Sequence, residues 1–172
     1  MKLFDRHGRR VEQAARLRRE GDAPAAIDLL ARVLTADPSH VAANAEMARA
    51  LRLLGDPAGA EEHLRAAIEQ VLDYTLVVEL AQALVEQDRV EEAEEYLDAA
   101  LFMTENQPRL DPAEALIVRA VIRHAQERDE DALAALDQIQ RKRARHDSWR
   151  HAERVREAAE ASLASRRPPV EG

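Results

Sequence analysis

The sequence predicts an all-α protein in which a short helical unit repeats along the chain. Only 3% of the 172 residues are aromatic, while the strong helix formers Ala, Leu, Glu and Arg are frequent. Gly21 and Gly55 stand 34 residues apart, and each is followed by the same pattern of Asp, Ala and Leu. A repeat of this period indicates a solenoid, in which stacked helical hairpins share a continuous core.

The pattern returns twice more with other residues in the glycine position. Asp88 and Glu127 take that position in the third and fourth units. The four versions are Gly21, Ala26, Leu30 and Val33; Gly55, Ala60, Leu64 and Ala67; Asp88, Ala93, Leu97 and Ala100; and Glu127, Ala132, Leu136 and Ile139. We therefore expect about four helix-turn-helix units.

Apolar residues recur at helical spacing within each unit, and this spacing sets the expected helices. Start signals support them. Asp56 and Asp111 each precede a proline suited to the first helical position, and Asp88 with Glu91 has the spacing of a capping box. The expected helices span residues 9–20, 23–36, 40–54, 57–71, 74–87, 90–104, 112–126 and 129–142.

Alanine recurs at one position of each helix, which allows paired helices to approach closely. The two columns are Ala14, Ala48, Ala81 and Ala120 in first helices, and Ala26, Ala60, Ala93 and Ala132 in second helices. A last amphipathic stretch near 147–165 has one apolar stripe, which includes Trp149. Because an open-ended solenoid needs a terminal helix with one apolar face, we expect a capping helix there, followed by a flexible tail over 166–172.

These residues resemble the tetratricopeptide repeat (TPR), a helix-turn-helix unit of this period with small and large apolar residues at fixed positions. The resemblance extends over most of the chain and implies one TPR-like domain over residues 1–165. The expected repeats are about 8–41, 42–73, 74–107 and a degenerate 112–142.

Three residues depart from the TPR pattern. Leu72 stands where the unit-ending proline is expected, Asp88 replaces the turn glycine, and Arg123 occupies a large apolar position of the fourth unit. The chain also uses arginine almost to the exclusion of lysine, a coding bias typical of a high-GC bacterial genome. We expect a bacterial TPR protein.

The resemblance implies a right-handed superhelix whose concave wall consists of the first helices. An apolar column, an acidic column and two mixed columns are expected to face this groove. The candidate partner-binding residues are Val11, Glu12, Arg18, Ala45, Glu46, Arg49, Arg52, Val78, Glu79, Gln82, Ile117 and Val121.

This groove suits a partner segment with apolar anchors and mixed charge, with Val78 and Ile117 supplying apolar contacts and Arg49 and Arg52 fixing charged groups. The alternative is that Val11, Val78 and Ile117 pack between adjacent repeats. Family members that hold the carboxyl-terminal tails of heat-shock chaperones use lysines and asparagines in these columns, and this sequence has neither there. That ligand class is therefore not expected.

Charge is unevenly distributed along a chain whose net charge is −8. Residues 1–20 and 139–172 are basic, whereas residues 58–107 carry thirteen acidic and two basic side chains. Solvated helix faces would account for this layout, and so would head-to-tail contact between molecules. The basic segment 141–156 has enough arginines for phosphate contacts, but Trp149 lies on the apolar stripe and the chain is acidic, so nucleic acid is not an expected partner.

No motif points to catalysis, a metal or a cofactor. His146 and His151 are five residues apart and do not share a helix face, and no phosphate loop or nucleophile motif is present. The first ten residues are charged where a signal peptide would be apolar, and no apolar run is long enough to span a bilayer. We expect a cytoplasmic, non-enzymatic protein with no cofactor and no membrane insertion.

Two functions fit these observations. The first is a non-catalytic adaptor that binds a protein or peptide segment in the concave groove; a cytoplasmic secretion-type chaperone is a narrower form of it, suggested by size and repeat type. The second is a self-assembling scaffold, a homo-oligomer in which the basic end of one molecule meets the acidic middle of another.

Overall fold

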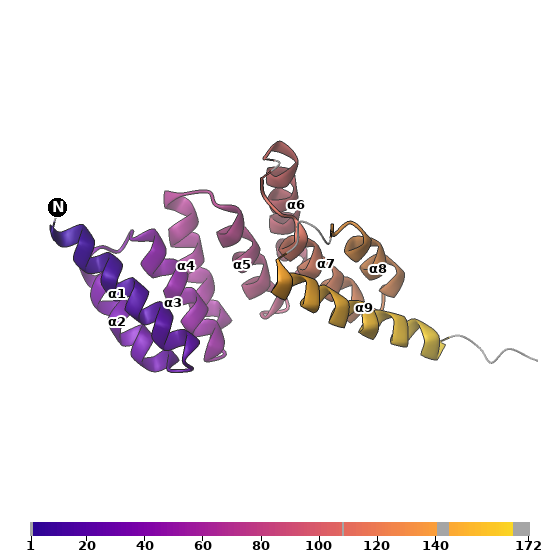
Figure 1. The fold of residues 1–172 in the computed structure, drawn as a ribbon, viewed down its shortest axis with the longest axis horizontal. Helices are drawn as coiled ribbons and strands as arrows, with labels where there is room; N and C mark the ends of the chain where they lie inside the picture. The colour runs from indigo at the N-terminus through magenta and orange to yellow at the C-terminus, as the bar shows by residue number, and fades with distance from the viewer. Residues whose placement is uncertain (1, 108, 141–144, 167–172) are drawn as a thin grey trace, which may run out of the picture. The chain divides into compact units, whose positions relative to one another are not determined.

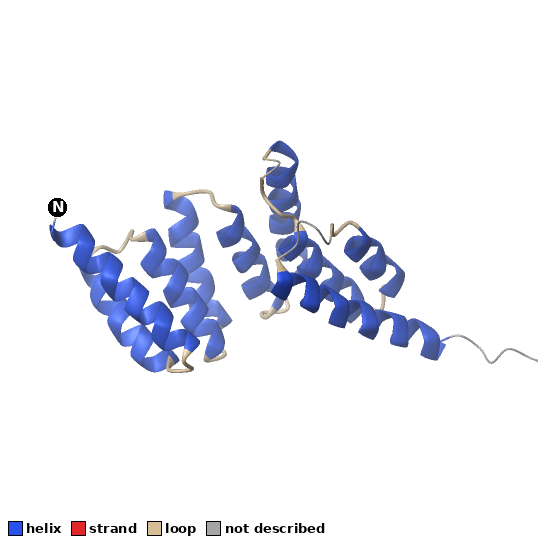
Figure 2. Ribbon diagram, in the orientation of Figure 1, coloured by secondary structure: helices blue, strands red, loops and turns tan. Residues whose placement is uncertain are grey.

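The computed structural model describes residues 2–107, 109–140 and 145–166, and all regular structure in these ranges is helical (Figures 1 and 2). The helices of the described ranges are α1 (Lys2–Arg19), α2 (Ala23–Ala36), α3 (Val41–Leu53), α4 (Pro57–Gln70), α5 (Tyr74–Val85), α6 (Val90–Asn106), α7 (Ala113–Ala125), α8 (Asp129–Asp137) and α9 (His146–Arg166).

Eight helices were expected in hairpins and one as a cap, and the observed bounds differ most at two of them. Helix α1 begins at Lys2, seven residues before the expected start. Helix α8 ends at Asp137, because the N–H groups of Gln138 and Ile139 bond to carbonyls three residues back and tighten the last turn. Residues 141 and 142, where the expected helix ended, and the tail residues 167–172 lie outside the described part of the chain.

The chain divides into two compact units, Met1–Ala93 and Glu94–Gly172, and the boundary falls inside α6. In the N-terminal unit, α1 pairs with α2 and α3 with α4; α2 and α1 also contact α3, and α5 packs on α4. The core shared by α1, α2 and α3 consists of Val11, Ala14, Ala23, Ala26, Leu30, Val33, Ala43, Met47 and Ala50.

In the C-terminal unit, α7 pairs with α8, and α9 packs against both of them, as expected for a capping helix. Trp149 is half-buried and packs against this core. The buried residues of the cluster are Ala113, Leu116, Ile117, Ala120, Ala132, Ala135, Leu136, Ile139, Ala152, Val155 and Ala159.

The same turn joins the two helices of each unit, so the backbone geometry confirms four repeat units. Its left-handed position is held by Gly21 (φ 92°), Gly55 (φ 77°), Asp88 (φ 60°) and Glu127 (φ 60°). In each turn the following residue donates its N–H to the carbonyl five residues back, as in a Schellman motif. These bonds run from Asp22 to Leu17, Asp56 to Leu51, Arg89 to Leu84 and Arg128 to Arg123, at 2.8–3.0 Å.

The left-handed turn corrects one expectation about capping. Asp88 does not cap α6 with Glu91, because it occupies the turn and the helix begins two residues later at Val90. Asp56 caps α4 as expected, accepting from the N–H of Gly59 at 2.9 Å. Asp73 caps α5 in the same way, although no start signal was assigned there.

Both alanine columns are buried. Every member, from Ala14 and Ala26 in the first unit to Ala120 and Ala132 in the fourth, has no exposed surface. A larger side chain at these positions would push helices apart. None of the described helices combines the length and apolar character needed to cross a bilayer.

Candidate functional site

A groove of about 470 Å³ opens on the N-terminal unit, over the first helices of its repeats. Seven of its eleven lining residues are apolar. The lining comprises Val11, Glu12 and Ala15 of α1; Val41, Ala42, Ala45, Glu46 and Arg49 of α3; Val71 and Asp73 between α4 and α5; and Leu76 of α5.

The groove contains five of the residues expected to bind a partner: Val11, Glu12, Ala45, Glu46 and Arg49. Their positions follow from helical spacing, since residues three and four apart share a face of α3. The walls are built from helices whose opposite faces are fixed in the core. The groove is therefore held by rigid elements and not by loops alone.

An ion-pair network runs beside the groove across three first helices. Arg18 of α1 bonds Glu46 of α3 at 2.9 Å, and Arg49 bonds Glu46 at 2.5 Å. Arg49 also reaches Glu79 of α5 at 2.7 Å. Arg52 pairs with Glu86 at 2.5 Å, so the arginine side chains expected to meet a partner are engaged inside the molecule.

Burial shapes the protonation of this network. It raises the pKa of Glu79 above its ordinary value, because the two bonds to Arg49 do not fully offset the loss of solvent. The pKa of Arg49 is raised despite its own burial, because Glu79 and Glu46 both stabilise the charged form. One oxygen of Glu79, Oε2, is buried and accepts no hydrogen bond from the described residues.

The remaining predicted residues do not line the groove. Val78 is 3% exposed and Ile117 is 0% exposed, so each packs between helices and offers no open apolar surface, in line with the alternative reading of these positions. Ile117 and Val121 belong to the C-terminal core. Gln82 accepts a hydrogen bond from Arg52 at 2.8 Å.

Sequence reasoning missed the residues that close the groove from the α4–α5 segment. Val71 is 46% exposed and lines the groove together with Asp73 and Leu76. The signal was present: Val71 and Leu72 are two consecutive apolar residues where the repeat pattern places a unit-ending proline. Val71 therefore adds exposed apolar surface to the margin of the groove.

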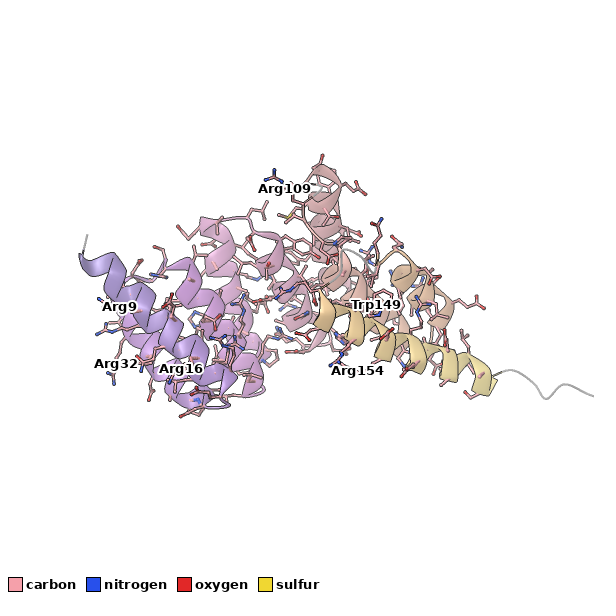
Figure 3. The ribbon with its side chains drawn as sticks, viewed as in Figure 1. Arg9, Arg16, Arg32, Arg109, Trp149 and Arg154 are labelled. Atoms are coloured by element: carbon pink, nitrogen blue, oxygen red, sulfur yellow. The ribbon has the colours of Figure 1, made fainter. Side chains whose placement is uncertain are left out.

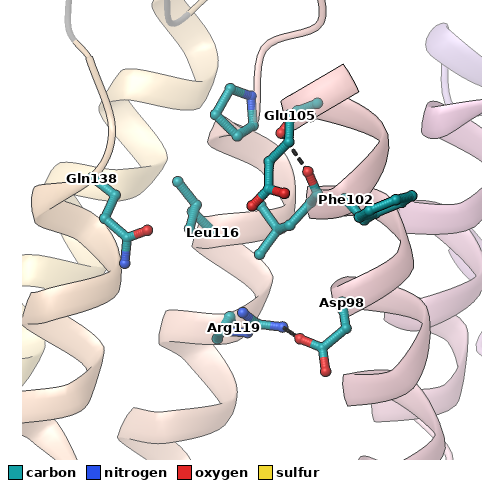
Figure 4. Close-up of a pocket in the computed structure, with 9 residues that line it drawn as sticks. Asp98, Phe102, Glu105, Leu116, Arg119 and Gln138 are labelled. Carbon is teal, nitrogen blue, oxygen red and sulfur yellow. Dashed lines mark hydrogen bonds and ion pairs between the residues drawn. The ribbon is translucent and has the colours of Figure 1, made fainter. Parts of the chain in front are cut away.

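A second cleft, of about 520 Å³, lies in the C-terminal unit and is shown in Figure 4. Phe102 of α6 stands at its edge and is 65% exposed. Arg119 pairs with Asp98 across the cleft at 2.5 Å. The sequence contained a signal for Phe102, because it falls off the buried stripe that contains Leu97 and Ala100.

Two charge clusters stabilise the C-terminal unit. Glu94 pairs with Arg119 at 3.2 Å and with Arg123 at 3.0 Å, which explains how an arginine is tolerated in a large apolar position of the repeat. The buried carboxylate of Asp129 bonds His124 at 2.5 Å and Arg166 at 3.0 Å. Hydrogen bonds from His124 and Ser162 hold the pKa of Asp129 below its ordinary value.

Both the acidic and the basic stretches of the sequence take part in ion pairs. Glu61, Glu92, Glu94 and Asp98 of the acidic middle form ion pairs with arginines. In the basic stretches, Arg16 is exposed on α1 and pairs with Glu20 at 3.1 Å, and Arg154 is exposed on α9 (Figure 3). Residues 141–144 of the basic segment lie outside the described ranges. Within the described ranges, no three His, Asp or Glu side chains gather as a metal site would require.

Comparison with known proteins agrees with this architecture. Two sequence profiles of the tetratricopeptide repeat match the chain, one over residues 17–77 and the other over 78–147. No curated protein matches the chain significantly.

Solved structures resemble the fold closely. Nearly identical TPR-like repeats of a putative kinesin light chain from Podosopora anserina have a TM-score of 0.76 at 22% identity, covering 96% of this chain and 90% of that chain. A thermophilic TPR protein from Thermus thermophilus has a TM-score of 0.68 at 21% identity, with 92% and 89% covered. MamA protein has a TM-score of 0.65 at 18% identity, and the match covers 92% of this chain and 88% of that chain. These similarities place the fold in the all-α, helical solenoid class.

Proposed function

Because the chain belongs to the tetratricopeptide repeat family, whose repeats are in general protein–protein interaction scaffolds, we propose that it is a cytoplasmic, non-catalytic adaptor that binds a partner segment in the groove of its N-terminal unit. A secretion-type chaperone would be one adaptor of this kind. The partner in this proposal is a protein or peptide, and neither nucleic acid nor a cofactor has a role in it.

The observation that carries the proposal is the groove itself. It is mostly apolar, it is wide enough for several side chains, and it lies over the first helices of consecutive repeats. Ala42 and Val71 leave apolar surface open to solvent at its margin. A segment with apolar side chains would remove that surface from water and gain binding energy in proportion to the area covered.

The self-assembling scaffold has less support. It requires the acidic middle to attract the basic end of another molecule, yet several of those acids are already bonded to arginines of the same chain, as Glu61 is to Arg89 at 2.5 Å. Light scattering across ionic strength separates the two functions. Charge-driven assemblies should dissociate in high salt, whereas an apolar groove should keep its partner.

The experiment that tests the adaptor function uses Ala42→Trp. Ala42 is exposed and lines the groove, so an indole there should fill the groove with little effect on folding. Ala31→Trp, on the exposed face of α2, is the matched control. We expect affinity purification from a lysate, followed by titration with the recovered partner, to show at least tenfold weaker binding for Ala42→Trp and unchanged binding for Ala31→Trp.

A second result would contradict binding in the groove. If Ala42→Trp recovers the same partners with unchanged affinity, while charge reversal at Glu91 and Glu95 on the exposed face of α6 removes them, the binding surface is the acidic face and not the groove.

A further inference from the structure

We infer that the groove selects an apolar segment that carries a cationic side chain, lysine or arginine, and rejects segments with an acid in its place. This inference rests on the proposed function and adds the chemical class of the partner. It follows from a count of which charges at the groove are already balanced inside the molecule and which are not.

The network beside the groove is neutral as a whole. Arg18 and Arg49 contribute two positive charges, and Glu46 and Glu79 contribute two negative ones. All four side chains are at least two-thirds buried, with 11–30% of each exposed. Because the arginines already have carboxylate partners, they have little capacity left to fix an acidic group on a partner. This reverses the role expected for Arg49 from the sequence.

Two other carboxylates in the groove lining have no basic side chain paired with them among the described residues. Glu12 of α1 and Asp73, the residue before α5, are both exposed, and no described arginine, lysine or histidine forms an ion pair with either. Asp73 accepts hydrogen bonds from the N–H groups of Thr75 and Leu76, which leave its charge in place. The lining therefore has an excess of negative charge.

The two carboxylates should differ in how strongly each attracts a cation on the partner. Asp73 lies at the N-terminus of α5, where the partial positive charge of the helix end offsets part of its field. Glu12 lies in the interior of α1, where no helix end offsets its field, and Arg16 one turn further on is already paired with Glu20 at 3.1 Å. We therefore expect Glu12 to contribute more than Asp73 to the attraction of a cation.

The apolar lining supplies the rest of the specificity. Val41, Ala42 and Val71 line the same groove as the two carboxylates and would contact aliphatic side chains next to the partner's cation. A lysine or arginine is well suited to this setting, because its hydrocarbon stem covers apolar surface while its charged end reaches a carboxylate. An acid at the same place would meet like charge, and such repulsion is how interfaces reject wrong partners.

The test begins with a library of short random peptides displayed on phage and selected on the intact protein. We expect the selected peptides to be enriched in lysine or arginine next to Leu, Ile or Val, and we expect Ala42→Trp to abolish the selection. The strongest peptide is then synthesised with its cation unchanged, replaced by Gln, or replaced by Glu, and each form is titrated by fluorescence anisotropy.

Charge-only substitutions identify the groups responsible. Glu12→Gln should weaken the cationic peptide about threefold, as expected for a partly exposed ion pair, and should leave the Gln peptide unchanged. Asp73→Asn keeps the cap of α5 and should have a smaller effect in the same direction. Glu62→Gln, at an exposed position of α4 outside the lining, is the control and should change neither peptide.

Three results would overturn the inference. If the Lys, Gln and Glu peptides bind equally and Ala42→Trp blocks all of them, the groove binds segments without regard to charge, and the proposed function survives alone. If the preference for a cation persists in the Glu12→Gln, Asp73→Asn double variant, the cation is bound elsewhere. If no cationic peptide is selected, the inference fails, and the capture experiment with Ala42→Trp decides the proposed function separately.

Discussion

Glu127 occupies the left-handed position of the turn between α7 and α8, and we predict that Glu127→Gly stabilises the protein. At φ 60° the Cβ of an L-residue crowds the following carbonyl, a strain that glycine does not have. The Glu127 carboxylate forms none of the ion pairs described above. The carbonyl that accepts a hydrogen bond from Arg166 at 2.8 Å belongs to the backbone and is retained in the variant.

The magnitude follows from two opposing effects. Relief of left-handed strain is worth roughly 1–2 kcal/mol, and the greater freedom of glycine in the unfolded chain costs roughly 0.5–1 kcal/mol. The net expectation is about 0.5–1 kcal/mol of added stability. Asp88→Gly should give less, because aspartate tolerates this conformation better than glutamate.

Gly55→Ala is the reciprocal experiment. No atom outside the adjoining residues lies within 4 Å of the position that a Cβ would take at Gly55, so the substitution adds backbone strain without a collision. We expect a loss of about 1 kcal/mol. Urea unfolding followed by far-ultraviolet circular dichroism measures all three changes, and an unchanged slope confirms that only stability has moved.

The reasoning would be refuted if Glu127→Gly lowers the unfolding midpoint, or if Gly55→Ala leaves it unchanged. Either result would mean that the left-handed turn is not the shared feature that joins the helices of each unit.

Two further predictions concern packing and pH. Ala60→Trp should destabilise the fold by about 1–3 kcal/mol or more, because Ala60 is fully buried in a column where helices are in close contact. The control Glu62→Trp, on the exposed face of α4, should be nearly neutral. Equal denaturation midpoints for the two variants would show that the helix register is wrong. The pKa of Asp129 is lowered by folding, so its stabilisation is present above its ordinary pKa of 3.8 and is lost as pH falls through the lower folded value. The stability advantage of the wild type over Asp129→Asn should therefore shrink between about pH 5 and pH 2, and an advantage that is constant with pH would contradict the role of the ionised carboxylate.

The repeat itself could be predicted because its signals are local. Gly21 and Gly55 marked the left-handed turns, and the periodic alanines marked close helix contacts, so the second to seventh helices were expected within a few residues of their observed ends. Asp88 and Glu127 were recognised as members of the same column, although neither is the usual residue there. One helix start was predicted wrongly. The capping box of Asp88 with Glu91 does not form, because Asp88 occupies the left-handed position of the turn before α6.

The site was predictable only in part. Glu12, Ala45 and Arg49, which helical spacing assigned to the groove side of the first helices, are among the residues that line the groove. Spacing alone does not distinguish a side chain that faces a groove from one that packs against the next helix, and Ile117 proved to be the latter. Nor did it indicate that Val71 and Asp73 would close the groove from a connecting segment.

The sequence by itself determined the helical class, the period of the repeat, the turn positions and the alanine columns, because each depends on residues within one or two turns of helix or on a strict repeat. Only the tertiary structure decided how charge is balanced. Arg18, Glu46, Arg49 and Glu79 come from three helices, and their pairing depends on side-chain distances that no spacing along the chain specifies. The pairing neutralises the arginines and leaves Glu12 and Asp73 as the carboxylates of the groove lining that form no ion pair within the described residues.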